Sequence, residues 1–330
     1  PIKGGFFNKN YGEVKAVENV NFKIPEGEIL GLVGESGSGK TTLGRSIIRL
    51  IEPSAGEILY NNKNIIDYSE NEMRKLRKDF QIIFQDPFAS LDPRKKIFDI
   101  ISQGLKIHTN LNKQEIYEKV LTIIKDVGLQ EEHLNRYPHE ISGGEQQRAC
   151  IARALIREPE LLLLDEPFSN LDSAIKESVK EEIFKIVKET NTTTILVTHD
   201  INDAMNISDK ILIFKAGILQ QYDSPVKMYC EPANCYCAEI LGDMNKLFID
   251  NETYYVRPEN IRLVNKKSNY KVFVEKCLFQ GKEYRIKGRL DKEIWHFFST
   301  KPLTEKKDVY VDFGKKDLIY FDPVCKNFFK

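Results

Sequence analysis

Short apolar runs alternate with stretches of helical periodicity over the first two thirds of the chain. The runs 29–33, 80–84, 161–164 and 194–198 have the length and composition of buried strands. Positions at helical spacing lie between them: Leu43, Ile47, Ile48 and Ile51, then Ile116, Val120, Ile123, Ile124 and Val127. Strands that alternate with helices predict an α/β fold with a largely parallel sheet covered on both faces.

Two further patterns predict β-structure near the N-terminus. Residues 14–17 and 20–24 alternate apolar and polar side chains with period two, and Pro25-Glu26-Gly27 supplies a turn. Residues 59–66 indicate a hairpin, because Asn61 and Asn62 at its centre tolerate positive φ.

The pattern of apolar and polar residues changes near residue 242. Beyond it, short β-type runs are separated by turn residues, at 254–256, 271–274, 284–286 and 309–313. This spacing predicts a small all-β domain or barrel. A chain of 330 residues is long enough for two domains. We therefore expect an α/β domain over 1–241, with a helical subdomain at about 87–145, and a β-domain over 242–330.

Composition narrows the class of protein. Apolar residues make up 41% and charged residues 30%, as in ordinary globular proteins. No run approaches the roughly 18 to 20 apolar residues of a membrane-spanning helix, so we expect any membrane spans to come from other chains. The net charge is zero, although residues 244–330 carry nineteen Lys/Arg against twelve Asp/Glu. That excess suits either a solvated exterior or a surface for nucleic acid or lipid headgroups. The six cysteines lack a disulfide-framework pattern, which fits a reducing cytosol.

The first chemical motif follows the predicted strand 29–33. It fits the phosphate-loop pattern G-x-x-x-x-G-K-[ST] and lies between a strand and a helix, as such a loop requires. Glycines let backbone N–H groups wrap a triphosphate, a lysine reaches the β- and γ-phosphates, and a hydroxyl ligates Mg²⁺. The residues expected to contact ATP here are Gly34, Glu35, Ser36, Gly37, Ser38, Gly39, Lys40, Thr41 and Thr42.

The second half of the predicted site is the run 161–164 with the two carboxylates that follow it. Asp165, at the carboxyl end of a buried strand, can hold the Mg²⁺ shell. Glu166 is positioned to act as a general base that polarises the attacking water.

The segment Ile141-Ser142-Gly143-Gly144-Glu145 and the helix that follows it decide the class. A serine and two glycines at a helix N-terminus form a second anion-binding cap. The segment resembles the signature of the ABC (ATP-binding cassette) ATPases, with Ile and Glu in place of the commoner Leu and Gln. The resemblance implies a P-loop NTPase core in which this cap faces the nucleotide of a partner subunit.

Other positions match the same family and take their expected roles from it. Gln85 resembles the Q-loop glutamine, which touches Mg²⁺ or water. Asp172 lies in a D-loop-like segment at the dimer interface, and His199 resembles the switch histidine that contacts the γ-phosphate. Tyr11 stands where the family places a ring against adenine, unless that role lies elsewhere. The implied reaction is transfer of the γ-phosphoryl group of ATP to water, and Thr41, Gln85 and Asp165 are the expected metal-site residues.

Two resemblances indicate an importer and disagree about its cargo. Stretches 1–5, 12–17, 34–45 and 84–94 resemble the ATPases of oligopeptide, dipeptide and nickel permeases. The tail, with Tyr255-Val256-Arg257-Pro258-Glu259, resembles the OB-like TOBE domain of ATPases that import polyamines, sugars, iron, sulfate or molybdate. The alternatives are a soluble ABC ATPase of translation or DNA repair, and an exporter ATPase.

The family resemblance also implies partners and a location. They are a second cassette, identical or paralogous, two transmembrane permease subunits, and an extracytoplasmic solute-binding protein, with no nucleic acid. The chain would work at the cytoplasmic face of the membrane. Cys230, Cys235 and Cys237 could ligate a metal, but their spacing is not a standard one and no fourth ligand lies nearby, so incidental cysteines are favoured.

Overall fold

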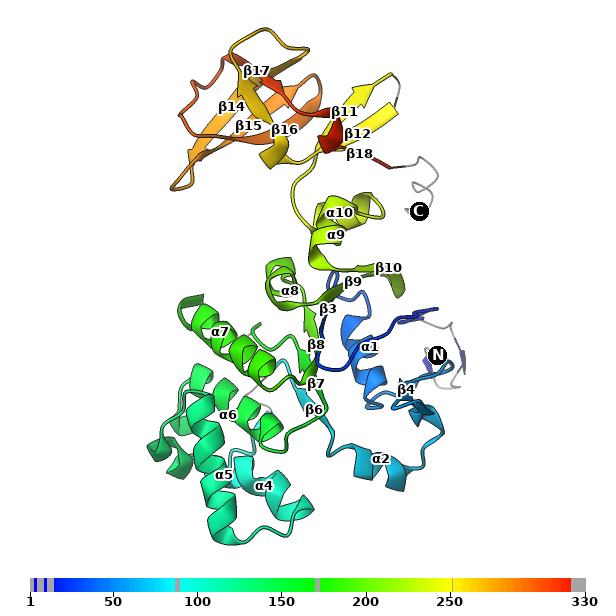
Figure 1. The fold of residues 1–330 in the computed structure, drawn as a ribbon, viewed down its shortest axis with the longest axis vertical. Coiled ribbons are helices and arrows are strands. Elements are labelled where there is room, and N and C mark those ends of the chain that lie inside the picture. Colours follow the sequence, from blue (N-terminus) through cyan, green and yellow to red (C-terminus); the bar gives the residue numbers. More distant parts are fainter. Residues whose placement is uncertain are drawn as a thin grey trace. The chain divides into compact units, whose positions relative to one another are not determined.

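A computed structural model describes residues 3–4, 9–10, 15–86, 90–169, 173–250 and 252–321. The chain forms two compact units, Pro1–Pro225 and Val226–Lys330 (Figure 1). This division lies N-terminal to the predicted boundary at 242, because helices α9 (Pro225–Cys230) and α10 (Cys235–Ile240) group with the strands that follow them. Two hydrophobic clusters lie in the first unit and one in the second.

A six-stranded sheet forms the centre of the first unit, in the order β10-β9-β3-β8-β7-β6. The strands are β3 (Ile29–Val33), β6 (Phe80–Ile83), β7 (Leu161–Asp165), β8 (Thr193–Thr198), β9 (Lys210–Lys215) and β10 (Ile218–Asp223). All run parallel except β10, which pairs antiparallel with β9 at one edge. The parallel α/β sheet is confirmed.

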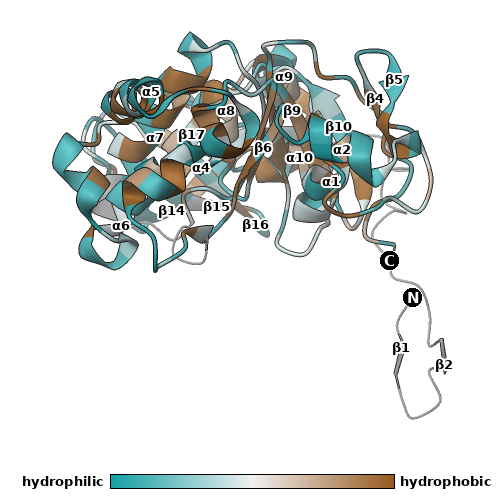
Figure 2. Cartoon of the chain, turned by 90° about the horizontal axis from the view of Figure 1, so that it is seen from below, coloured by the Kyte–Doolittle hydropathy of each residue, from teal (hydrophilic) through white to brown (hydrophobic). Residues whose placement is uncertain are grey.

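Helices cover both faces of this sheet. They are α1 (Lys40–Ile47), α2 (Glu70–Leu76), α4 (Ile97–His108), α5 (Lys113–Asp126), α6 (Gly143–Leu155), α7 (Ser173–Glu189) and α8 (Ile201–Ile207). Leu162 and Leu164 of β7 join the core with α4 to α7, whereas Leu161 and Leu163 join the core with α1 and α2. Alternate residues of a strand point to opposite faces, so β7 anchors both layers. In Figure 2 strand β6 is hydrophobic and helix α2 is largely hydrophilic.

The structure confirms one of the two β-structure predictions near the N-terminus and contradicts the other. The hairpin is confirmed: β4 (Leu59–Tyr60) pairs with β5 (Lys63–Asn64), and Asn61 and Asn62 have φ of 49° and 61°. The strands predicted within 15–24 are wrong. Val17, Val20, Phe22 and Ile24 pack against the core in a segment that forms no strand, and Asn19 within it has φ of 50°. The alternation of apolar and polar residues in this segment therefore reflects burial of the apolar side chains and not a strand. A short pair, β1 (Lys3–Gly4) and β2 (Lys9–Asn10), precedes this segment.

The second unit is rich in β-structure. One sheet has the order β11-β12-β18 and the other β13-β17-β14-β15-β16. The strands are β11 (Asn245–Ile249), β12 (Glu252–Val256), β13 (Arg262–Val264), β14 (Tyr270–Phe279), β15 (Tyr284–Leu290), β16 (Glu293–Ser299), β17 (Asp308–Asp312) and β18 (Leu318–Tyr320). Trp295 and Phe297 are fully buried at its centre. The β-rich tail is confirmed, and its assignment to the TOBE type stays a prediction. Within the described residues, no helix has the length and apolarity needed to traverse a bilayer.

Candidate functional site

The predicted phosphate loop connects the carboxyl end of β3 to the first turn of α1. Its glycines are required by the backbone, since Gly39 has φ of 104°, and a Cβ there would lie 2.1 Å from the carbonyl oxygen of Ala16. Gly37 has φ of 77° and no atom within 4 Å of where its Cβ would be. The loop is therefore closely packed at Gly39, and at Gly37 it leaves space beside the backbone into which a phosphate group would fit.

Lys40 lies across this loop and is buried. Its Nζ donates to the carbonyl oxygens of Gly34 and Glu35, each at 2.8 Å. Burial lowers the pKa of Lys40, and the nearby carboxylates of Glu166, Asp165 and Glu35 oppose that shift. The ammonium group is thus held by backbone at the mouth of the loop, beside the carboxylates that follow β7.

Asp165 ends β7 with both carboxylate oxygens engaged. The Thr41 hydroxyl donates to Oδ1 at 2.9 Å, and Arg45 reaches Oδ2 through Nε at 3.0 Å and Nη2 at 2.9 Å. Thr41 and Arg45 both belong to α1, so these contacts join the first helix to β7, the strand next to the sheet-edge strand β6. The structure therefore brings together two predicted metal-site residues that are 124 positions apart in sequence.

Glu166 lies between two other predicted catalytic side chains, Gln85 and His199. Its Oε2 accepts from Gln85 Nε2 at 3.2 Å and lies 3.4 Å from His199 Nδ1. The Glu166 backbone N–H donates to the carbonyl oxygen of Val197 at 2.9 Å, and its φ of 48° lies in the left-handed region. A non-glycine residue held there is strained, which is common at functional sites. β6, β7 and β8 deliver Gln85, Glu166 and His199 to one edge of the sheet.

Ser142 is the N-cap of α6, and Glu145 completes a capping box. The Glu145 carboxylate accepts from the Ser142 backbone N–H at 2.7 Å and from its hydroxyl at 2.9 Å. The backbone hydrogen bond from Ser142 holds the pKa of Glu145 below its ordinary value. His133 Nε2 lies 3.4 Å from the other carboxylate oxygen. The glutamate in place of the commoner glutamine thus stabilises the start of the helix.

Gln147 is a link that the sequence reasoning missed. It is fully buried in α6, and its Nε2 donates to the carbonyl oxygen of Pro167 at 2.7 Å. It therefore ties the Ser142–Gly144 helix to the residue directly after Glu166. A polar side chain within the helix after the signature segment was the available signal, but its partner could be identified only from the fold.

Two predicted residues, Tyr11 and Asp172, lie outside the described residues. The cysteines are not gathered by the fold into a ligand set: Cys230 is exposed, Cys235 is half-buried and Cys237 is buried. Across the described ranges, no group of three or more His, Cys, Asp or Glu side chains is arranged to hold a metal.

Comparison with known proteins identifies the family. Residues 17–169 match the family model described as ABC transporter. The oligopeptide transport ATP-binding protein AppF of Bacillus subtilis is 41% identical over 245 residues, which is 74% of this chain and 74% of that protein. The chain belongs to the ABC transporter family. This cassette is also 44% identical over 233 residues to the oligopeptide transport ATP-binding protein OppF of Bacillus subtilis, covering 70% of this chain and 76% of that one.

Solved structures agree with the sequence comparison. The dimeric post-hydrolysis state of the ATP-binding cassette MJ0796, bound to ADP and phosphate, has a TM-score of 0.60 and 32% identity. The match covers 66% of this chain and 94% of that one. The P-loop NTPase fold is thereby confirmed. The cassette binds ATP, and its hydrolysis of ATP is coupled to transport by a membrane transporter.

Proposed function

We propose that this cassette is the ATP-hydrolysing subunit of an importer whose cargo is peptides. The observation that carries the proposal is the set of relatives named as oligopeptide transport or peptide import ATP-binding proteins, at 41 to 44% identity over about 70% of the chain. The side chains that hydrolysis needs meet at one edge of the sheet, which supports an active enzyme.

The phosphate loop suits a triphosphate and a hard cation. Ser38 Oγ is buried and, within the described part of the chain, has no hydrogen-bond partner, as expected for a group that binds phosphate. The oxygens of Thr41 and Asp165 are the donors that Mg²⁺ prefers, and Gln85 lies beside Glu166. Mg²⁺, when bound there, would neutralise charge that develops on the phosphate oxygens.

Glu166, His199 and Gln85 would carry out the chemical step. Glu166 would accept a proton from water as the water oxygen bonds to the γ-phosphorus and the bond to the ADP oxygen breaks. His199 and Gln85 would hold that water and the γ-phosphoryl group in line. Lys40 and the loop N–H groups would stabilise the charge shared by the phosphate oxygens.

The N-terminus of α6, where Ser142 is exposed, supports an assembly of two cassettes. The N-terminus of α6, with Ser142, Gly143 and Gly144, would bind the nucleotide of a second cassette, so that two ATP molecules lie between two chains. Two permease subunits would supply the membrane spans and hold the cassettes at the cytoplasmic face. A solute-binding protein outside the membrane would deliver the cargo.

The test is to isolate the transporter from its own membranes. The tagged full-length chain is purified in mild detergent, its partners are identified by mass spectrometry, and the complex is reconstituted in vesicles. We expect two polytopic membrane proteins and a binding protein that stimulates ATPase activity when it is loaded with peptides. Stimulation by polyamines, sugars or metal ions alone would replace the peptide assignment with the class suggested by the TOBE-like tail. Ribosomal or DNA-repair partners without permeases would contradict the transport role.

A further inference from the structure

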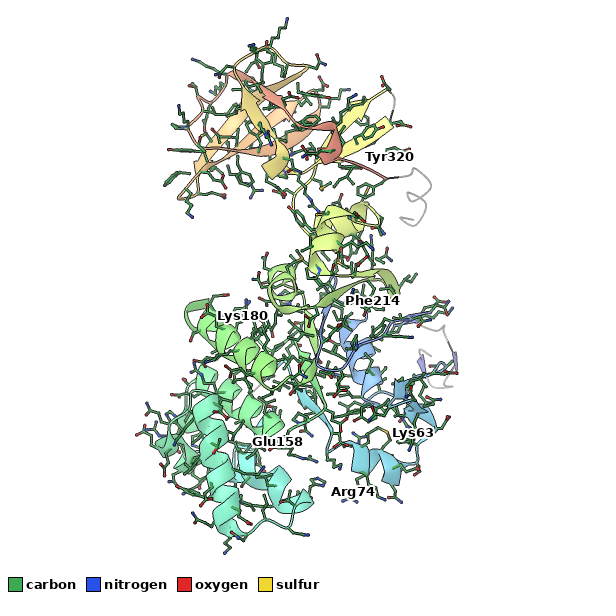
Figure 3. All side chains as sticks on the ribbon, in the orientation of Figure 1. Lys63, Arg74, Glu158, Lys180, Phe214 and Tyr320 are labelled. Atoms are coloured by element: carbon green, nitrogen blue, oxygen red, sulfur yellow. The ribbon has the colours of Figure 1, made fainter. Side chains whose placement is uncertain are left out.

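Lys180, on helix α7, is a buried cation that does not belong to the site described above (Figure 3). Its side chain is 7% exposed, and its Nζ lies 2.5 Å from Asp203 Oδ1, 3.0 Å from Glu177 Oε1 and 3.9 Å from Asp200 Oδ2. Burial lowers the pKa of Lys180, but hydrogen bonds to Asp203 and Glu177 outweigh that effect and raise it above its ordinary value. A lysine surrounded by carboxylates in this way stays charged, and its position is fixed.

Two of its partners hold the segment that carries His199. Asp200, the next residue, is the N-cap of α8, and its carboxylate accepts from the Asn202 backbone N–H at 3.0 Å. The Asp200 backbone N–H donates to the Thr198 hydroxyl at 3.0 Å. Asp203, one turn into α8, is 6% exposed and is the closest partner of Lys180. Lys180 therefore anchors the short helix that begins immediately after His199.

The same ammonium group also lies against the segment that carries Glu166. Its Nζ is 5.9 Å from the centre of the Phe168 ring, two residues after Glu166. Phe168 is buried and packs edge-on against Phe184 of α7, with ring centres 5.5 Å apart. A cation over an aromatic face is attracted to it, more strongly when both are away from water. Lys180 thus contacts both chain segments that leave the sheet after β7 and β8.

We propose that Lys180 is a positioning residue for ATP hydrolysis: by holding Asp203 and Phe168 together, it fixes the separation of His199 and Glu166. The proposal rests on the proposed function, since it concerns the same reaction. Lys180 would act through Asp203 and Phe168, which lie close in sequence to His199 and Glu166.

The test compares variants of the full-length chain in steady-state ATP hydrolysis. Lys180→Met keeps most of the length of the side chain and removes the charge, whereas Lys180→Arg retains the charge. Lys185→Met is the matched control, because Lys185 lies on the same helix, is 72% exposed and pairs only loosely with Glu189 at 3.8 Å. Misplacing catalytic groups by about 1 Å costs about a hundred-fold in rate, so we expect kcat of Lys180→Met to fall by roughly ten- to a hundred-fold. KM for ATP should not change, Lys180→Arg should recover most of kcat, and Lys185→Met should match the wild type.

A second variant separates positioning from folding. Lys180→Met leaves Asp203 buried without its cation, whereas Lys180→Met with Asp203→Asn removes both charges and should restore the melting temperature. We expect this double variant to fold and still to have a low kcat with an unchanged KM. A double variant with the kcat of the wild type would overturn the proposal, as would a Lys180→Arg variant no more active than Lys180→Met. Hydrolysis by the wild type that Glu166→Gln does not reduce would instead overturn the role of Glu166 in the proposed function.

Discussion

Replacing Arg45 by methionine tests how the Asp165 carboxylate is held. The Asp165 side chain is 2% exposed, and Arg45 contacts its Oδ2 through two nitrogens at 2.9 and 3.0 Å. The guanidinium also lies 5.8 Å from the centre of the Phe84 ring, next to Gln85. Methionine preserves most of the aliphatic stem but removes the charge, which leaves Thr41 as the remaining side-chain donor to Asp165 in the described structure.

The expected loss of stability in Arg45→Met follows from the burial of the Asp165 carboxylate. Removing one partner of a buried ion pair costs about 3–5 kcal/mol, because the other charge is left without its counter-ion. Arg45 itself is 35% exposed, so water already screens part of the pair, and we expect a loss of about 2 kcal/mol. For a unit of this size, about 1 kcal/mol lowers the melting temperature by about 2–4 °C, which gives a decrease of about 4–8 °C.

The two units can be followed separately in one sample. The long helices belong to the first unit, so helical circular dichroism reports on it, whereas Trp295 is the only tryptophan and reports on the second. We expect the helical signal of Arg45→Met to melt earlier, and Mg²⁺ with ADP to recover part of the loss by neutralising Asp165. Lys119→Met, which removes an exposed pair with Glu158, should cost about 1 kcal/mol or less. An Arg45→Met variant that melts like Lys119→Met would refute this reasoning.

Two further predictions concern the helix cap and the β-rich unit. The lowered pKa of Glu145 means that its stabilising effect is complete above its ordinary pKa of 4.5 and is lost as the pH falls through the depressed folded-state value. Glu145→Gln should therefore lose less stability than the wild type when the pH falls below 4.5. Melting temperatures measured against pH test this, and an equal acid dependence of the two proteins would contradict the stabilising role of the Glu145 carboxylate. Phe297→Ala empties a fully buried position and should cost the second unit about 3–5 kcal/mol. Urea unfolding followed by Trp295 fluorescence measures this, and a loss below about 1 kcal/mol would contradict the assigned core.

The geometry of the candidate phosphate loop was predictable because its chemistry is local. A loop that must place glycines at positive φ and a lysine beside phosphate leaves a short pattern in sequence, and Gly39 and Lys40 have the expected positions. The motifs predicted Thr41 and Asp165 each as a metal-site residue, and the long-range hydrogen bond between them comes from the fold.

The residues that support the site were not predictable in the same way. Lys180 lies on α7, a helix rich in charge, and Arg45 lies on the short helix α1. A lysine or arginine on a helix is usually solvated. Only the packing of α7 on α8, and of α1 on β7, gives them buried partners. The segment 15–24 shows the opposite case. The alternation of apolar and polar residues predicted the burial of Val17, Val20, Phe22 and Ile24, but it could not show whether a neighbouring strand exists.

The most direct test of the account is ATP hydrolysis by the full-length chain and its Glu166→Gln variant, with ATP binding measured in parallel. General base catalysis contributes about 10²–10⁴-fold, so kcat should fall by about that factor while ATP binds as tightly as before. Specific activity of the wild type should rise with protein concentration, because each site would need the Ser142–Gly144 segment of a second chain. A Glu166→Gln variant that hydrolyses ATP at the rate of the wild type would contradict the assignment of Glu166 and the mechanism built on it.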